Sequence, residues 1–279
     1  MKLLCKALLL LTSFGLLISS ARAATWTTVD FPGAVSSQAR AINSAGDIVG
    51  VYSDAFNQHG FLLKNGNFTT IDPPGSVRTD LQGINDSGVI SGFFQTSTQD
   101  AEGFLFDGKN FTMLNFPGFA DTVATGINNA GQVVGYYGNF GSNSDYHGFL
   151  WTNGSFVTIE VGAEGETVLT GINNRGHITG YNPFNFVTFL RNPQGSIGKI
   201  AFSNPCCGLA AGVNDHKVIV GYYPGAERFG FRLAITPKVL TKPHFPGSAA
   251  TFCFGINNTN QTVGYYTISG IAHGFMRTQ

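Results

Sequence analysis

A short sequence element recurs six times along this chain, and its repetition restricts the fold more than any other feature. The element is Gly or Ala, then Ile or Val, then Asn, and four copies have Gly three residues after the Asn. The asparagines are Asn43, Asn85, Asn128, Asn173, Asn214 and Asn257. Successive copies lie 42, 43, 45, 41 and 43 residues apart. A period of this length is typical of propeller blades or solenoid units.

Each repeat has the pattern of four short strands separated by turns. In the third copy, residues 125–127, 133–137 and 147–151 are runs of strand-forming residues. Asn128 and Gly131 fit the first and fourth positions of a tight turn between the first two runs. The fourth strand often ends at Phe-Pro-Gly, because proline has no N–H for the sheet ladder. No segment of ten or more residues after the N-terminal region has a helical period, so we predict a helix-free fold.

The two ends of the repeat array complement each other. The sixth copy stops after its third strand, at residues 275–277, while residues 25–33 have the pattern of a fourth strand. We therefore expect the N-terminal strand to pair into the last sheet and close a ring. The predicted fold class is all-β, a six-bladed β-propeller of four-stranded antiparallel blades. An open solenoid would leave both ends exposed, and the sequence has no polar caps for them.

The N-terminal segment predicts export. Lys2 and Lys6 precede an apolar run over residues 7–18, and Ala21-Arg22-Ala23 supplies the small residues of a cleavage site. We interpret residues 1–23 as a signal peptide and residues 24–279 as a single propeller domain. The expected location is secreted or periplasmic, with no membrane span after cleavage.

Charge argues against nucleic acid as a partner. The chain has 16 basic and 16 acidic residues, and three of the basic ones lie in the predicted signal peptide. The remaining chain is weakly acidic and has no basic run. It also has no calcium-loop, nucleophile-elbow or phosphate-loop motif, so we expect no cofactor.

Three cysteines remain after the signal peptide, which is an odd number for an exported protein. They are Cys206, Cys207 and Cys253. The repeat places Cys206 and Cys207 near Cys253, so a disulfide between Cys207 and Cys253 is one expectation. Pairing through Cys206 instead, or a vicinal Cys206–Cys207 bridge, is the alternative. No CxxC motif or histidine cluster accompanies them, so we predict no metal site.

Loop lengths indicate which face of a propeller would bind a ligand. Turns between strands 1–2 and 3–4 share one face and are short here, whereas loops 2–3 and 4–1 share the other. From the repeat Asn to the third-strand Phe the count varies from 16 to 21 residues. Variable loops on a rigid scaffold commonly carry recognition. The predicted binding residues on this loop face, near the central channel, are Arg78, Asp80, Asp121, Phe140, Asp145, Tyr146, His147 and Glu166.

Two groups of residues, each of which includes some of the predicted binding residues, have a second interpretation. His59, His147 and His273 all precede a Gly-Phe pair, and we expect them to pack or hydrogen-bond rather than bind metal. Glu164 and Glu166, with Asp121 or Asp145, would supply an acid and a base if they faced one another across a cleft. On exposed loops such carboxylates are usually solvated, so no catalytic residue is assigned.

The repeat resembles that of the HAF family of exported bacterial proteins. The resemblance is carried by residues 126–135, Gly-Ile-Asn-Asn-Ala-Gly-Gln-Val-Val-Gly, by the His-containing third strand and by endings such as Phe116-Pro117-Gly118. It covers essentially all of residues 24–279. The chain has His-Gly-Phe at His59, His147 and His273 where the family has His-Ala-Phe, and its fourth copy is eroded. The resemblance implies a bacterial exported repeat protein and brings no catalytic residues with it.

These features together favour a non-catalytic, exported β-propeller. We expect it to bind a glycan or an extracellular or envelope protein through the loop face. The alternatives are a propeller glycoside hydrolase or lyase that uses loop carboxylates, and a structural or adhesive envelope protein.

Overall fold

Antiparallel strands make up the regular structure of this protein. The computed structural model describes residues 23–97, 100–140, 145–162, 166–202, 207–225 and 228–278, and within those ranges it has 24 strands and no helix. In this described part of the chain, therefore, no helix is long and apolar enough to cross a membrane. The predicted signal peptide, apart from its last residue, lies outside the described residues. The prediction of a helix-free, all-β fold is confirmed.

The strands follow one another in sets of four. The first set is β2 (Ser36–Ile42), β3 (Ile48–Ser53), β4 (Gln58–Lys64) and β5 (Asn67–Thr70). The second is β6 (Arg78–Ile84), β7 (Ile90–Gln95), β8 (Ala101–Phe106) and β9 (Phe111–Met113). The third is β10 (Asp121–Ile127), β11 (Val133–Gly138), β12 (His147–Thr152) and β13 (Ser155–Ile159). The fourth is β14 (Val168–Ile172), β15 (Ile178–Tyr181), β16 (Thr188–Arg191) and β17 (Ile197–Ile200). The fifth is β18 (Leu209–Val213), β19 (Val218–Tyr222), β20 (Gly230–Ala234) and β21 (Val239–Thr241). The last is β22 (Ala250–Ile256), β23 (Thr262–Ile268), β24 (Ile271–Thr278) and β1 (Thr25–Val29).

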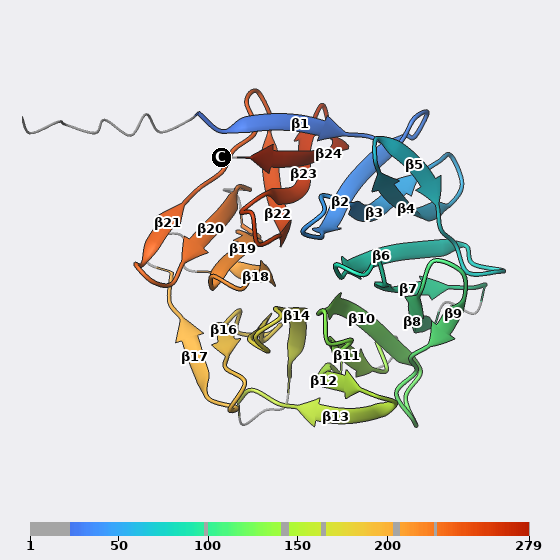
Figure 1. Ribbon diagram of the computed structural model, residues 1–279, viewed down its shortest axis with the longest axis vertical. Helices are drawn as coiled ribbons and strands as arrows, with labels where there is room; N and C mark the ends of the chain where they lie inside the picture. Colours follow the sequence, from blue (N-terminus) through green and yellow to red (C-terminus); the bar gives the residue numbers. More distant parts are fainter. Residues whose placement is uncertain are drawn as a thin grey trace, which may run out of the picture.

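Hydrogen bonding joins these strands into five sheets. Four sheets have four antiparallel strands each, as the repeat predicted. The fifth has eight strands, because one parallel pair, Gln58 with Arg78, connects β4 to β6. Figure 1 shows the strands arranged radially, with the first strand of each set nearest the centre and the fourth on the outside.

The N-terminal strand completes the last sheet. β1 pairs antiparallel with β24, from Thr25 opposite Thr278 to Val29 opposite Gly274. Trp26 packs edge-on against Phe245 and Phe275, with ring centroids 5.3 and 4.9 Å apart. The expected pairing of the N-terminal strand with the last repeat is therefore confirmed (Figure 1).

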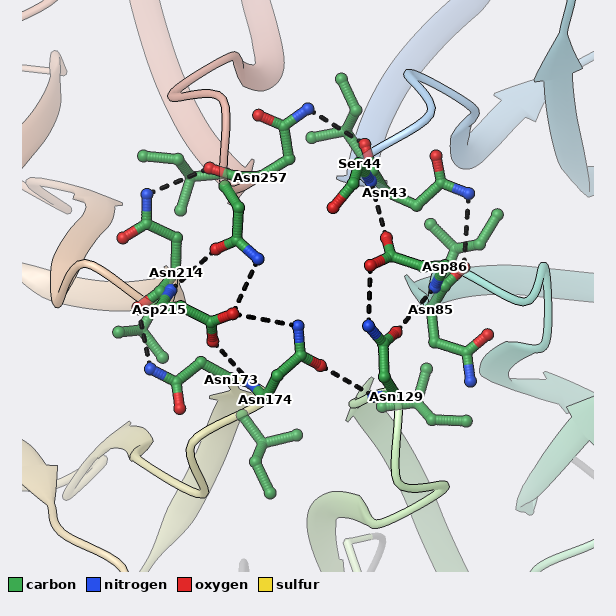
Figure 2. A pocket seen from close by; sticks show the side chains of 17 residues that line it. Asn43, Ser44, Asn85, Asp86, Asn129, Asn173, Asn174, Asn214, Asp215 and Asn257 are labelled. Carbon is green, nitrogen blue, oxygen red and sulfur yellow. Dashed lines mark hydrogen bonds between the residues drawn. The ribbon is translucent and has the colours of Figure 1, made fainter.

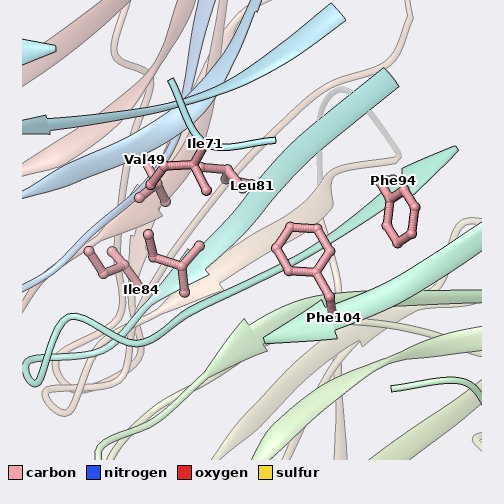
Figure 3. Packing of buried hydrophobic residues seen from close by; sticks show 7 residues of the cluster. Val49, Ile71, Leu81, Ile84, Phe94 and Phe104 are labelled. Carbon is pink, nitrogen blue, oxygen red and sulfur yellow. The ribbon is translucent and has the colours of Figure 1, made fainter. Parts of the chain in front are cut away.

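The core lies between neighbouring sets of strands. In each set of four strands, the phenylalanine of the third strand is fully buried. These residues are Phe61, Phe104, Phe149, Phe189, Phe231 and Phe275. Figure 3 shows one interface, where Val49 and Ile71 of the first repeat meet Leu81, Ile84 and Phe104 of the second. Burying an aromatic or aliphatic side chain of this kind contributes about 1.5–3 kcal/mol.

Small residues before each Ile/Val-Asn let the inner strands approach one another. A Cβ on Gly83 would lie 3.0 Å from the Cα of Gly126, and one on Gly126 would lie 3.2 Å from the Cα of Gly171. Larger side chains at these positions would push neighbouring sets of strands apart.

The predicted disulfide between Cys207 and Cys253 is not formed, so that expectation was wrong. Cys253 is a free thiol on β22 and is fully buried. Its Sγ lies against Gly230 of β20, at the position where other repeats have Leu81 or Leu169. It is a core residue, and burial raises the pKa of its thiol to about 12. Cys206 lies outside the described residues.

Candidate functional site

Two positions of each repeat line the central axis. The third residue before the repeat Asn is Arg40, Gln82, Thr125, Thr170, Ala211 or Phe254. The eighth residue after it is Val51, Phe93, Tyr136, Tyr181, Tyr222 or Tyr265. Members of both groups border the axial cavity described below. The residues at these positions differ between repeats, although each is followed by the recurring Gly/Ala-Ile/Val-Asn element or preceded by it.

A cavity of about 190 Å³ opens at the end of the axis next to the 2–3 loops. Its aromatic wall is Tyr136, Tyr181, Tyr222 and Phe254. Its polar wall is Gln82, Thr125 and Thr170, and Val123, Val168, Ala210 and Ala211 complete it. We call it the tyrosine cavity. Aromatic walls with a few convergent polar groups are typical of small-ligand sites.

The tyrosines of this cavity remain neutral across the ordinary pH range. Burial raises the pKa of Tyr136 and Tyr181, and the neighbouring phenols raise it further. Burial also raises the pKa of Tyr222. Each hydroxyl can therefore both donate and accept a hydrogen bond to a ligand.

A partly buried ion pair lies beside the tyrosine cavity. The Nε and Nη2 atoms of Arg40 each donate to a different carboxylate oxygen of Asp80, at 3.3 Å. Asp80 is 1% exposed, and Nη2 of Arg78 lies 3.9 Å from it. The guanidinium of Arg40 lies over the Phe254 ring, 4.5 Å from its centroid. This two-point pairing fixes Asp80 and Arg40 in place.

Four of the residues predicted from sequence lie around this cavity. Arg78 and Asp80 belong to the ion pair just described. Phe140 and Tyr146 stack on each other at 5.0 Å and lie 5.4 and 5.8 Å from Tyr136, which lines the cavity.

Asp121 and Glu166 have a structural role instead. The two carboxylate oxygens of Asp121 accept the backbone N–H groups of Ala101 and Phe140, both at 2.8 Å. Glu166 accepts the N–H of Tyr146 at 3.2 Å. They position the loops that flank the cavity. Glu164 lies outside the described residues.

His147 and Asp145 form part of a separate cluster on the outer strands. The Nδ1 atom of His147 lies 2.7 Å from Glu160, and its Nε2 atom lies 2.9 Å from Asp145. His59 and His273 have the same contact, with Nδ1 2.6 Å from Asp72 and 2.7 Å from Asp30. The expectation that these histidines hydrogen-bond is confirmed. Among the described residues, no group of three or more His, Cys, Asp or Glu side chains is arranged to hold a metal ion.

The opposite end of the axis carries a closed ring of asparagines, shown in Figure 2. The Nδ2 atom of each repeat asparagine donates to the main-chain oxygen of the next, and Asn257 donates back to Asn43 at 3.0 Å. The other five links have lengths of 2.8–3.3 Å. Asp86 and Asp215 at this opening are also paired, for example with Asn129 and Asn258. We call this the asparagine ring; its polar groups satisfy one another.

Sequence reasoning missed the aromatic residues of the cavity, which are Tyr136, Tyr181, Tyr222 and Phe254, and it missed Arg40 beside them. The signal was present in the aligned repeats, because the eighth position after the Asn is aromatic in five of six copies. The predicted binding residues were instead selected from the variable loops, which left out the tyrosines on the strands.

Comparisons with known proteins identify the fold. No family model matches the sequence, and no curated protein matches it either. Solved structures do match. Virginiamycin B lyase from Staphylococcus aureus is 10% identical, with a TM-score of 0.56 over 92% of this chain and 100% of its own. A gluconolactonase from Xanthomonas campestris is 10% identical, with a TM-score of 0.56 over 87% and 86%. The Aleuria aurantia lectin, in complex with Fucalpha1-6GlcNAc, is 13% identical, with a TM-score of 0.56 over 87% and 91%.

These likenesses define the class of protein: the chain is a β-propeller. At such low identity they establish the fold alone. Propellers of this shape include both enzymes and a lectin, so the fold is compatible with binding and with catalysis.

Proposed function

We propose that this protein is an exported, non-catalytic propeller that binds a carbohydrate in the tyrosine cavity. The observation that carries the proposal is the composition of that cavity, with Tyr136, Tyr181 and Tyr222 beside Thr125 and Thr170. Aromatic rings stack on the C–H faces of sugars, and neutral hydroxyls exchange hydrogen bonds with sugar hydroxyls. The lectin among the similar structures, which holds a fucosylated disaccharide, is consistent with a sugar ligand on this fold.

We propose further that residues 24–279 form one propeller of six blades. The asparagine ring has one member in each repeat, and it closes from Asn257 to Asn43. The eight-stranded sheet is then two blades that touch through the single pair Gln58–Arg78.

Export and membership of the HAF repeat family belong to the same proposal. The charged start, the apolar run and the Ala21-Arg22-Ala23 site support a signal peptide cleaved after Ala23. The product would act outside the cytoplasm.

The test is sugar binding by purified residues 24–279 on a broad glycan array, followed by titration calorimetry with the best ligand. Tyr181→Phe and Tyr222→Phe each remove one cavity hydroxyl, and each should weaken binding about fivefold, as expected for one hydrogen bond of about 1 kcal/mol. The control is Tyr52→Phe, which removes a hydroxyl bonded to Thr70 on the outer strands.

Two results would contradict the proposal. If both cavity variants bind the sugar like the unaltered protein, the ligand does not occupy this cavity. If mass spectrometry detects cleaved sugar after incubation, the protein is an enzyme rather than a binding module.

A further inference from the structure

We propose that the sugar bound by the tyrosine cavity is an acidic one, a uronic acid whose carboxylate is held by Arg78. This inference rests on the proposed function and specifies its ligand class. It comes from the charges that border the cavity, taken with the positions of two arginines.

Two arginines and one carboxylate, Arg40, Arg78 and Asp80, form a cluster beside the tyrosine cavity. Burial has the largest effect on the pKa of Tyr136 and raises it; Asp80 also raises that pKa, while Arg78 and Arg40 lower it. At the neighbouring Tyr265 burial again raises the pKa, and Arg40 and Arg228 lower it. Three guanidinium groups therefore lower the pKa of one or both of these phenols, and Asp80 raises that of Tyr136.

Two further carboxylates near the cavity, those of Asp121 and Glu166, accept hydrogen bonds from backbone N–H groups. Asp121 accepts N–H groups from Ala101 and Phe140, and Glu166 accepts one from Tyr146. These hydrogen bonds direct both groups to the loops that flank the cavity. They do not form an ion pair with Arg78 among the described residues.

The two arginines beside Asp80 differ in the number and length of their contacts with its carboxylate. Arg40 meets Asp80 through two hydrogen bonds and lies over Phe254, so it is fixed. Arg78 lies 3.9 Å from the same carboxylate, and its Nη1 atom donates to Gln95 at 3.4 Å.

Arg78 is therefore the group that can take an anionic ligand. Its side chain is 44% exposed, and its guanidinium lies 5.0 Å from the centroid of the Phe93 ring. A guanidinium has five N–H donors in a planar fork, which suits two-point binding of a carboxylate. A carboxylate attached to a sugar ring would satisfy this fork while the ring packs on the tyrosines.

The test compares an acidic sugar with its uncharged counterpart. Trigalacturonate and its fully methyl-esterified form have the same ring structure and differ in charge. Titration calorimetry at low salt should show at least tenfold tighter binding of the acid, as expected for a charge-assisted hydrogen-bonded pair. Arg78→Gln should weaken binding of the acid about tenfold and binding of the ester less than threefold.

The control is Lys109→Gln, which removes the same unit of charge from an exposed turn between β8 and β9. It should leave the preference for the acid unchanged. Equal affinity for acid and ester would overturn the inference and leave the proposed sugar site standing. Binding of neither sugar, if the glycan array also gives no ligand, would overturn both. A preference for the acid that survives Arg78→Gln would show that Arg78 does not hold the carboxylate.

Discussion

The histidine before Gly-Phe acts as a clamp between the third and fourth strands of a repeat. His59 holds Asp72 through Nδ1, and the same carboxylate accepts the N–H of Gly60 at 3.1 Å. His273 and Asp30 repeat the arrangement, with the N–H of Gly274 at 3.0 Å. The carboxylate at the end of the fourth strand therefore recurs for a structural reason.

This clamp predicts a pH-dependent stability. Burial lowers the pKa of His59, but hydrogen bonds and charges from Asp72 and Asp54 outweigh it, so the pKa is raised above 6.5. A group whose pKa is higher in the folded state stabilises that state fully at pH values below its unfolded pKa. We therefore expect the free energy of unfolding to fall as the pH rises above about 6.5 through the raised pKa.

The measurement is urea unfolding between pH 5.5 and 8.5. His59→Gln should flatten this part of the profile. The control is His244→Gln, because His244 contacts the main-chain oxygen of Ser248 rather than a carboxylate. An unchanged slope in His59→Gln would show that the clamp does not contribute.

Strand β1 completes the last sheet and so joins the N-terminal end of the chain to the last repeat. It supplies the outer strand of the last sheet through five residue pairs. A chain that begins at Gly33 should therefore fold with an unpaired β24 edge and lower stability. A peptide of residues 24–32 added in trans should bind that edge and restore much of the loss.

Fluorescence of Trp26 reports this binding directly, because the ring packs between Phe245 and Phe275. The matched control peptide has Trp26→Ala and should bind at least about tenfold more weakly, because it loses the contacts of this half-buried ring with Phe245 and Phe275. Its binding would be followed by competition with the unaltered peptide. Equal affinity of the two peptides would contradict this account of the closing strand.

The sequence predicted the strands, and the pairing of β1 with β24, because turn residues and strand-forming runs recur at the same positions of each repeat. It did not predict which strand residues face the axis. Each inner strand has an irregularity, between Ala124 and Gly126 in β10, for example, and this interrupts the alternation of side chains. Thr125 and Tyr136 therefore meet at the cavity although simple alternation does not assign them to one surface. A similar irregularity lies between Cys253 and Gly255 in β22. The position of Cys253 in the repeat therefore did not predict the direction in which its thiol points.

At the scale of the whole molecule, the asparagine ring couples all repeats. Asn128 donates to the main-chain oxygen of Asn173, and its Oδ1 atom accepts the N–H groups of Ala130 and Gln132. Asn128 is 2% exposed, so its loss leaves buried polar groups without partners. We predict that Asn128→Ala lowers the free energy of unfolding by about 2–4 kcal/mol.

The loss of stability in Asn128→Ala should also be detected in parts of the molecule that are distant from Asn128. The buried Cys253 thiol on β22 reacts with an alkylating reagent only when the fold opens, so its labelling in urea, followed by mass spectrometry, measures unfolding far from Asn128. Labelling of Cys253 should shift to lower urea together with the fluorescence transition. The control is Asn67→Ala, an exposed position with a local bond to Asn65. A shift in fluorescence without a shift in labelling would mean that the repeats unfold independently.

The seam between β1 and β24 also has a mechanical consequence. Because the strands are antiparallel, Thr25 lies opposite Thr278, so both ends of the ring leave the molecule at one point (Figure 1). A force that pulls these ends apart loads one pair of residues at a time and peels the seam open from Thr25 toward Val29. Strands pulled past each other share the load among all their hydrogen bonds, whereas peeled strands do not. A protein tethered through residues near 24 and 278 would therefore yield first at this seam, at low force, while the remaining sheets stay intact.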